Sequence, residues 1–217
     1  MSPIRTVSIV GLFILALVLC AGCTQSAPAA IFETTPSGTP VPVMTTASAS
    51  PTTETVSPSA TLVAGKKVRL ETSMGNIVIE LSPEKPNTTR NFETLVEKGF
   101  YNGVIFHRVI DGFMIQGGDP TGTGRGGPGY LIDDEFTGTN KNNRGTVAMA
   151  NTGFPNTGGS QFFINTVDNN YLDSMHPVFG TVTEGMDVVD AITKVETNGH
   201  PYYRPLQNVT ILRATMI

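Results

Sequence analysis

Hydrophobic and polar residues alternate in short runs from residue 66 onward. In VRLET (68–72) and IVIEL (77–81) every second residue is apolar, and the SMGN sequence between the two runs suits a turn. A strand directs successive side chains to opposite faces, so a period of two indicates strands with one buried face. The two runs therefore predict a β-hairpin.

Further runs, rich in β-branched and aromatic residues and bounded by glycine-rich turns, predict more strands. They span residues 104–110, 113–116, 146–150, 161–166, 178–182 and 209–217. Residues 86–98, which start with a proline and precede Gly99, and residues 186–195 have the apolar spacing of helices instead. Many short strands with two lone helices indicate a mainly β fold, a closed antiparallel barrel with helical caps.

The N-terminal residues do not follow this pattern. Arg5 is the only charge before an apolar run from about residue 7 to 19, which small residues and Cys23 follow. These features are typical of a secretory signal, and the run is shorter than the roughly 20 residues of a membrane-spanning helix. The exit LCAGC resembles a lipobox, which implies residues 1–22 as signal peptide and lipidation of Cys23. An uncleaved N-terminal anchor helix is the alternative.

A stretch dominated by Thr, Ser, Pro and Ala separates the signal from the alternating region. Residues 23–65 contain no Lys or Arg and no hydrophobic period. Such a composition buries too little apolar surface to offset the entropy of ordering, so we expect a disordered tether. We expect one folded domain, residues 66–217, on the outer side of the cytoplasmic membrane or in the cell envelope.

Composition and motifs argue against several kinds of site. Both cysteines, Cys20 and Cys23, precede the domain, so it has neither disulfides nor a thiol nucleophile. A net charge of −4 does not suit a nucleic-acid partner. There is no metal-ligand motif, and GGSQF (158–162) lacks the second glycine of a nucleophile elbow. A dinucleotide-binding loop leads into a helix, whereas the glycine-rich run 121–127 leads into Pro128. We therefore expect no metal and no cofactor.

After these exclusions, the remaining candidates for a functional site are uncharged polar and aromatic residues around one arginine. In FHRVIDGFMIQGG (106–118), Arg108 and Gln116 flank apolar residues, and on a later strand Gln161 and Phe163 share one face. Such a site has no nucleophile and no acid–base pair. It favours a reaction without a covalent intermediate.

Four motifs carry a family resemblance. FHRVIDGFMIQGGDPTGTGRGG, GTVAMANTG, GGSQFFIN and YLDSMHPVFGTVTEGMDVVD, within residues 68–217, resemble the cyclophilin family of peptidyl-prolyl cis–trans isomerases. The resemblance implies a closed eight-stranded antiparallel β-barrel capped by two α-helices, with Arg108 as the catalytic residue and His107 as a structural one. The residues implied in substrate binding are Phe113, Met114, Gln116, Ala150, Asn151, Gln161, Phe163, Tyr171, Leu172 and His176.

A few positions depart from the family pattern or remain open. Tyr171 stands where many eukaryotic members have a Trp that binds cyclosporin, so a cyclosporin-type ligand should bind more weakly. The loop 151–160 is one residue longer around Phe154, which either reshapes the substrate groove or is a surface insertion without consequence. Asn87 and Asn208 begin N-glycosylation sequons, a motif that chance also produces.

The sequence predicts a monomeric, lipid-anchored prolyl isomerase that binds proline-containing segments of exported proteins and speeds their folding. Arg108 would stabilise the twisted amide electrostatically, without proton transfer. A binding or chaperone module that needs no turnover is the alternative, and loss of the arginine or of the pocket aromatics would favour it. The sequence retains them all.

Overall fold

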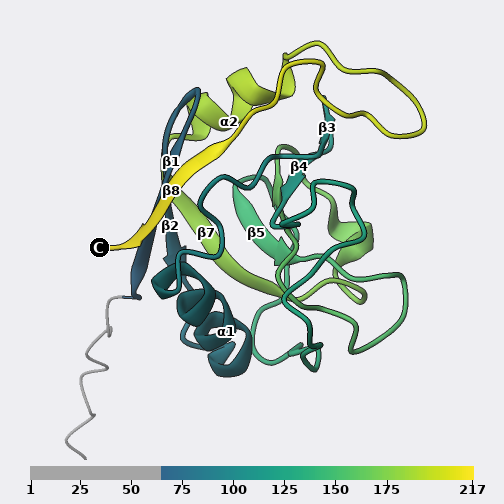
Figure 1. Ribbon diagram of the computed structural model, residues 1–217. Coiled ribbons are helices and arrows are strands. Elements are labelled where there is room, and N and C mark those ends of the chain that lie inside the picture. The colour runs from purple at the N-terminus through teal and green to yellow at the C-terminus, as the bar shows by residue number, and fades with distance from the viewer. Residues whose placement is uncertain (1–64) are drawn as a thin grey trace, which may run out of the picture. The chain divides into compact units, whose positions relative to one another are not determined.

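The computed structural model describes residues 65–217, so the predicted signal peptide, Cys23 and nearly all of the tether lie outside the described residues. Eight antiparallel strands form one sheet in the order β3-β4-β6-β5-β7-β2-β1-β8. The sheet curls into a half-barrel, and two helices lie at opposite ends of it (Figure 1). The elements are β1 (Lys67–Thr72), β2 (Gly75–Leu81), α1 (Pro86–Glu97), β3 (Arg108–Ile110), β4 (Met114–Gly117), β5 (Thr146–Met149), β6 (Phe162–Asn165), a short 3₁₀ helix η1 (Asn170–Leu172), β7 (Val178–Glu184), α2 (Met186–Thr193) and β8 (Ile211–Met216).

The predicted hairpin and both predicted helices are confirmed, whereas one strand is shorter than expected. β1 pairs with β2 in regular register from Lys67 to Thr72. The strand expected over residues 104–110 is reduced to β3. The segment before β3 forms separate hydrogen bonds, such as the Phe106 amide to the Val209 carbonyl at 2.9 Å, without a continuous ladder.

The prediction of a closed barrel is wrong, because the sheet is open. Its edges are β3 and β8. Backbone hydrogen bonds between residues 103–106 and 209–211, which include an isolated bridge between Ile105 and Thr210, join the two edges without a continuous ladder. β3 has three residues, and a loop already uses its outer edge, since the Val109 amide donates to the Tyr203 carbonyl at 2.9 Å. The loop, and not β8, therefore lies along the outer edge of β3.

Phe92 on α1 lies at the centre of the main hydrophobic core. Its ring centroid lies 5.0 Å from that of Tyr101, 5.3 Å from that of Phe162 and 5.1 Å from that of Phe179. All four side chains are completely buried. This aromatic cluster holds α1 against the sheet.

Strands β4, β5 and β6 bury both of their faces. On β6, Phe162 and Ile164 join the main core, whereas Phe163 between them joins a second cluster with Met114 and Leu172. This division follows from the alternation of side chains along a strand. The second cluster provides apolar walls for the site described below.

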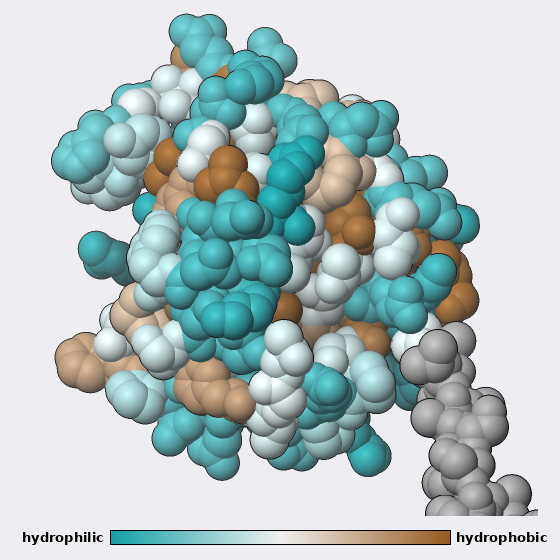
Figure 2. Space-filling model, turned by 180° about the vertical axis from the view of Figure 1, so that it is seen from behind, coloured by the Kyte–Doolittle hydropathy of each residue, from teal (hydrophilic) through white to brown (hydrophobic). Residues whose placement is uncertain are grey.

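Hydrophilic side chains cover most of the face seen in Figure 2, with separate hydrophobic patches between them. Large exposed hydrophobic residues include Phe154 and, in the loop before β8, Tyr202 and Leu206. Single exposed hydrophobic residues are common on folded proteins, so none of them marks a contact surface by itself. Within residues 65–217, neither helix is long and apolar enough to cross a membrane.

Candidate functional site

A row of cross-strand neighbours carries the site. Arg108 on β3 lies opposite Gln116 on β4. Gln116 lies opposite Phe163 on β6, which in turn lies opposite Ala148 on β5. Residues directly opposite in antiparallel strands point to the same face of the sheet. The strand register therefore gathers an arginine, an amide and an aromatic ring from distant parts of the sequence.

A cavity of about 190 Å³ opens beside this row. Its side walls are apolar, because Met114, Phe163 and Leu172 belong to the second hydrophobic cluster. Nine residues that the sequence predicts as site residues line it: Arg108, Phe113, Met114, Gln116, Ala150, Asn151, Phe163, Leu172 and His176. Gln161 and Tyr171, also predicted, lie next to the cavity and do not line it.

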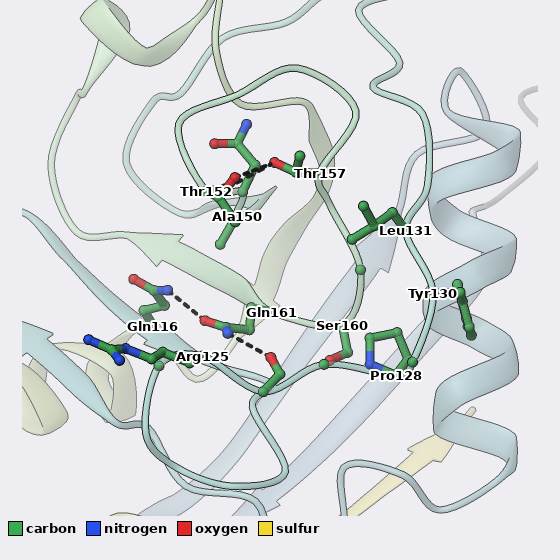
Figure 3. A pocket seen from close by; sticks show the side chains of 16 residues that line it. Gln116, Arg125, Pro128, Tyr130, Leu131, Ala150, Thr152, Thr157, Ser160 and Gln161 are labelled. Carbon is green, nitrogen blue, oxygen red and sulfur yellow. Dashed lines mark hydrogen bonds between the residues drawn. The ribbon is translucent and has the colours of Figure 1, made fainter.

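A relay of amides holds Arg108 in place. Its Nη1 donates to Gln116 Oε1 at 3.4 Å, and Gln116 Nε2 donates to Gln161 Oε1 at 3.0 Å. Gln161 Nε2 donates to the Gly126 carbonyl at 2.8 Å (Figure 3). Each amide must present its oxygen towards the arginine, because the carbonyl at the end of the relay can only accept. Gln161 thus supports the site through Gln116.

Arg108 lies in a partly apolar environment. Its guanidinium carbon is 5.7 Å from the centroid of the Phe113 ring, a distance typical of a cation–π contact. Partial burial lowers the pKa of Arg108, whereas the nearby hydroxyls of Tyr171 and Tyr203 raise it. A guanidinium remains protonated at neutral pH under such opposing influences. The site therefore contains a permanent, half-buried hydrogen-bond donor.

His176 and Tyr171 complete the rim of the cavity. His176 Nδ1 lies 3.0 Å from the Met149 carbonyl, which can only accept, so this nitrogen carries a proton and donates it. The His176 ring meets the edge of Phe163 at 5.3 Å between centroids. Tyr171 is 65% exposed and stacks on Phe113 at 6.3 Å. It covers the outer side of the pocket wall.

Three buried asparagines connect the pocket walls, and no motif in the sequence indicates them. Asn169 Nδ2 donates to the Phe113 carbonyl at 2.9 Å and to Asn165 Oδ1 at 2.8 Å. Asn165 Nδ2 donates to Asn142 Oδ1 at 3.1 Å, and Asn142 Nδ2 donates to the His176 carbonyl at 3.3 Å. This network ties one wall of the cavity to the segment that carries His176.

A second cavity, of about 430 Å³, adjoins the first and shares Gln116, Ala150 and Asn151 with it (Figure 3). Its other walls come from the glycine-rich loop 124–129 and from residues that follow it. The sequence of that loop, a glycine-rich run that leads into Pro128, contains no signal for this cavity. Phe154 is 71% exposed and lines neither cavity, whereas Thr152 and Thr157 of the same loop line the second one.

Asp119 organises the start of the glycine-rich loop. The residue is buried, and its carboxylate accepts the Thr121 amide at 2.7 Å and the Gly124 amide at 2.6 Å. Burial raises the pKa of Asp119, but hydrogen bonds from Thr121, Gly126 and Gly124 outweigh it and lower the pKa to about 2. A Cβ at Gly126 would collide with this carboxylate, so the loop requires glycine there.

This pKa predicts a loss of stability in acid. Because the folded-state pKa lies below the ordinary value of 3.8, the contribution is complete above about pH 4 and is lost as the pH falls through 2. We expect the free energy of unfolding to decrease by about 2 kcal/mol from this group. Urea titrations at pH 5 and pH 2.5 measure it. An Asp119→Asn variant should lack this component, and an equal acid loss in that variant would contradict the prediction.

The other two histidines, His107 and His200, differ in environment. His107 is buried, and neither ring nitrogen has a hydrogen-bond partner. Burial lowers the pKa of His107, so its ring stays neutral beside Arg108, which agrees with a structural role. His200 is exposed in the loop before β8. Among the residues that the structure describes, no group of three His, Cys, Asp or Glu side chains is arranged for a metal ion.

Known proteins share both this sequence and this fold. The model of a family described as "Cyclophilin type peptidyl-prolyl cis-trans isomerase/CLD" matches residues 67–216. Human and mouse proteins named "Peptidyl-prolyl cis-trans isomerase-like 1" are 48% identical over 157 residues, which cover 68% of this chain and 90% of each relative. A protein of the same name from Aspergillus fumigatus is 47% identical over 155 residues, covering 69% and 94%.

A solved structure extends the likeness to three dimensions. A cyclophilin type peptidyl-prolyl cis-trans isomerase of Cryptosporidium parvum is 34% identical, with a TM-score of 0.66 over 70% of this chain and 97% of that one. A second structure of that protein, in the presence of the dipeptide Ala-Pro, gives the same TM-score. The sequence match spans nearly all of the described residues, and the fold agrees with it. This chain therefore belongs to the cyclophilin-type peptidyl-prolyl cis–trans isomerase family.

Proposed function

We propose that this protein accelerates rotation about X–Pro bonds in polypeptides and that Arg108 donates the hydrogen bond that stabilises the twisted amide. One observation carries the proposal: a half-buried guanidinium lies at the edge of an apolar cavity whose walls include Met114, Phe163 and Leu172. The isomerase-like names of relatives that are 46–48% identical support the same activity.

The barrier to this reaction is electronic. Rotation breaks the amide resonance and costs about 18–20 kcal/mol, so X–Pro exchange without a catalyst takes tens to hundreds of seconds. In the twisted state the proline nitrogen regains its lone pair and accepts a hydrogen bond that the planar amide cannot accept. A fixed donor gains strength only there, which is preferential binding of the transition state. Arg108 can act in this way without giving up a proton.

The other side chains would bind and orient the substrate. Phe113, together with the apolar walls, would enclose the proline ring. Gln116 would join Arg108 in contacts to the substrate backbone, and the amide relay through Gln161 supports their orientation. Ala150 and Asn151 lie at the β5 end of the row and would contact the backbone on that side.

Acceleration of a proline-limited reaction tests the proposal. The purified protein should increase the cis–trans exchange rate of a proline peptide in NMR exchange spectra, and should speed the proline-limited refolding phase of a model protein. A bound peptide whose isomers exchange no faster than in free solution would contradict this. It would support the alternative of a binding or chaperone module without turnover.

The asparagine network predicts a positioning effect on the pocket. Asn169→Ala removes hydrogen bonds to the Phe113 carbonyl and to Asn165 Oδ1, and it leaves the buried Asn165 oxygen without a partner. We expect a loss of about 1–3 kcal/mol in unfolding free energy and a higher KM for proline peptides. Asn170→Ala, which removes an exposed hydrogen bond on the neighbouring residue, is the control. Equal KM values for both variants would argue against the positioning effect.

We propose further that the protein is exported and anchored by a lipid on Cys23, with residues 23–65 as a tether. The supporting observations are the apolar run after Arg5, the LCAGC exit and the Thr/Ser/Pro/Ala composition that follows. Its substrates would then be proline-containing segments of exported proteins, bound by a monomer. Mass spectrometry of the native N-terminus tests this, because a lipid-modified N-terminal Cys23 supports the proposal and an intact Met1 contradicts it.

A cyclosporin-type ligand is expected to bind weakly at this site. Tyr171 is exposed at the pocket rim, where its ring stacks on Phe113. Many eukaryotic family members provide an indole N–H at this position. The hydroxyl of a tyrosine leaves its ring in a different direction, so it does not replace that hydrogen-bond donor. The proposed isomerase activity does not depend on that contact.

A further inference from the structure

The loop from residue 196 to 206 is fastened to the strand that carries Arg108. The Val109 amide on the outer edge of β3 donates to the Tyr203 carbonyl at 2.9 Å. Arg204 Nη1 donates to the Gly122 carbonyl at 3.0 Å, and the Arg204 amide donates to Asn198 Oδ1 at 2.9 Å. The loop therefore has a defined place immediately beyond Arg108, on the side of β3 away from β4.

Tyr203 has an unusual backbone conformation within this loop. Its φ is +50°, in the left-handed region that bulky residues rarely adopt. Two backbone hydrogen bonds maintain it, one from the Tyr203 amide to the Gly199 carbonyl at 2.8 Å and one that its carbonyl accepts from Val109. Conformations of this kind concentrate at functional sites, so an outlier held by surrounding contacts supports a hypothesis of function.

The Tyr203 ring lies beside the site and retains a free surface. The side chain is half-buried, and its ring meets the ring of His200 edge-on at 6.0 Å between centroids. The Tyr203 backbone is bonded to Val109, the residue next to Arg108, and the Tyr171 ring stacks on Phe113, whose ring also contacts the Arg108 guanidinium. Tyr171 comes from a different segment, η1, and is mostly exposed. Two tyrosines from separate segments thus flank one arginine.

The order of strands gives these tyrosines a place along the substrate path. The site row runs from β5, where Ala148 leads to Ala150, across β6 and β4 to Arg108 on β3. Tyr203 is attached to the outer edge of β3, so it lies next along the same line. A peptide that crosses the cavity from the Ala150 end and extends beyond Arg108 would reach the loop with Tyr203 next.

We propose that Tyr203, together with Tyr171, binds the substrate residue that follows the proline and gives the enzyme a preference for an aromatic side chain there. The inference rests on the proposed isomerase function and adds a subsite to it. Exposed tyrosine rings offer apolar faces at a low entropy cost, and a second aromatic ring fits against them by stacking or edge-on contact. The adjacent Arg108 adds a cation that also favours an aromatic neighbour.

Blocked peptides Ala-Ala-Pro-Phe, Ala-Ala-Pro-Ala and Ala-Ala-Pro-Glu test the subsite, with kcat/KM measured by NMR exchange. We expect wild type to prefer Phe over Ala by about fivefold, the size of an aromatic contact. Tyr203→Asn should reduce this preference to about twofold or less, because asparagine tolerates the left-handed backbone but lacks the ring. Tyr203→Phe should retain it. Tyr202→Ala, which changes an exposed neighbour, is the control and should behave as wild type.

Each other outcome has a definite meaning. Equal rates on all three peptides in wild type, or an undiminished preference in Tyr203→Asn, would overturn the subsite. An equal loss on all peptides in Tyr203→Asn would show that the residue only supports the loop. Acceleration without a preference leaves the isomerase function standing, whereas no acceleration of any peptide by wild type contradicts that function itself.

Discussion

Arg108→Ala is expected to lower kcat/KM for X–Pro rotation by about 10²–10³, the usual cost of removing one preorganised hydrogen-bond donor from a transition state. The apolar walls remain in this variant, because Met114, Phe163 and Leu172 pack in their own cluster. The loss should therefore appear mainly in kcat. NMR exchange rates measured across a range of peptide concentrations separate kcat from KM.

Two further arginine variants make this result specific. Arg108→Lys keeps the charge but loses the planar fork of donors, so it should recover only part of the activity. Arg90→Ala changes an arginine on the exposed side of α1 and should have wild-type activity. A loss of activity of only about threefold in Arg108→Ala would be far smaller than the loss expected when a preorganised donor is removed. Another group would then stabilise the twisted amide.

Phe92→Ala is expected to cost about 3–5 kcal/mol of unfolding free energy, because it leaves a cavity in the middle of the main core. The ring packs against Tyr101, Phe162 and Phe179, all of which are completely buried. A loss of this size is a large fraction of the stability of an ordinary domain. Urea denaturation, followed by circular dichroism, measures the shift in midpoint.

Phe154→Ala is the matched control, since that ring is 71% exposed and should change stability by no more than about 0.5 kcal/mol. Phe92→Leu, with a smaller expected loss of about 1.5 kcal/mol or less, keeps the test informative if the alanine variant does not fold. A loss below about 1 kcal/mol for Phe92→Ala would show that α1 contributes little to the core.

Much of the fold is readable from local pattern, because alternation and helical spacing depend on neighbouring residues. The β1–β2 hairpin and both helices follow from it directly. The open sheet does not follow, since it depends on which distant segment reaches the outer edge of β3. There, Tyr203 supplies a carbonyl to Val109, and no periodicity in the sequence predicts that pairing.

The candidate site, too, could be predicted only in part from the sequence. Its residues could be identified from motifs, but their assembly depends on the register that aligns Arg108, Gln116 and Phe163. The amide relay ends on the Gly126 carbonyl, which only the folded loop brings near Gln161. Asn142, Asn169 and Asp119 lie in ordinary loop sequences and Asn165 ends β6, so their roles depend on long-range contacts that a single sequence does not reveal.

The most direct test of the account compares binding and turnover in one titration of the Arg108→Ala variant with a proline peptide. The central claim is that the guanidinium stabilises the twisted amide far more than the planar one. The variant should therefore bind the peptide with a Kd within about threefold of wild type, while the exchange between bound isomers slows by about 10²–10³. Fast exchange in the variant would contradict the claim. So would a Kd that weakens in proportion to the lost rate, because Arg108 would then be a ground-state binding residue.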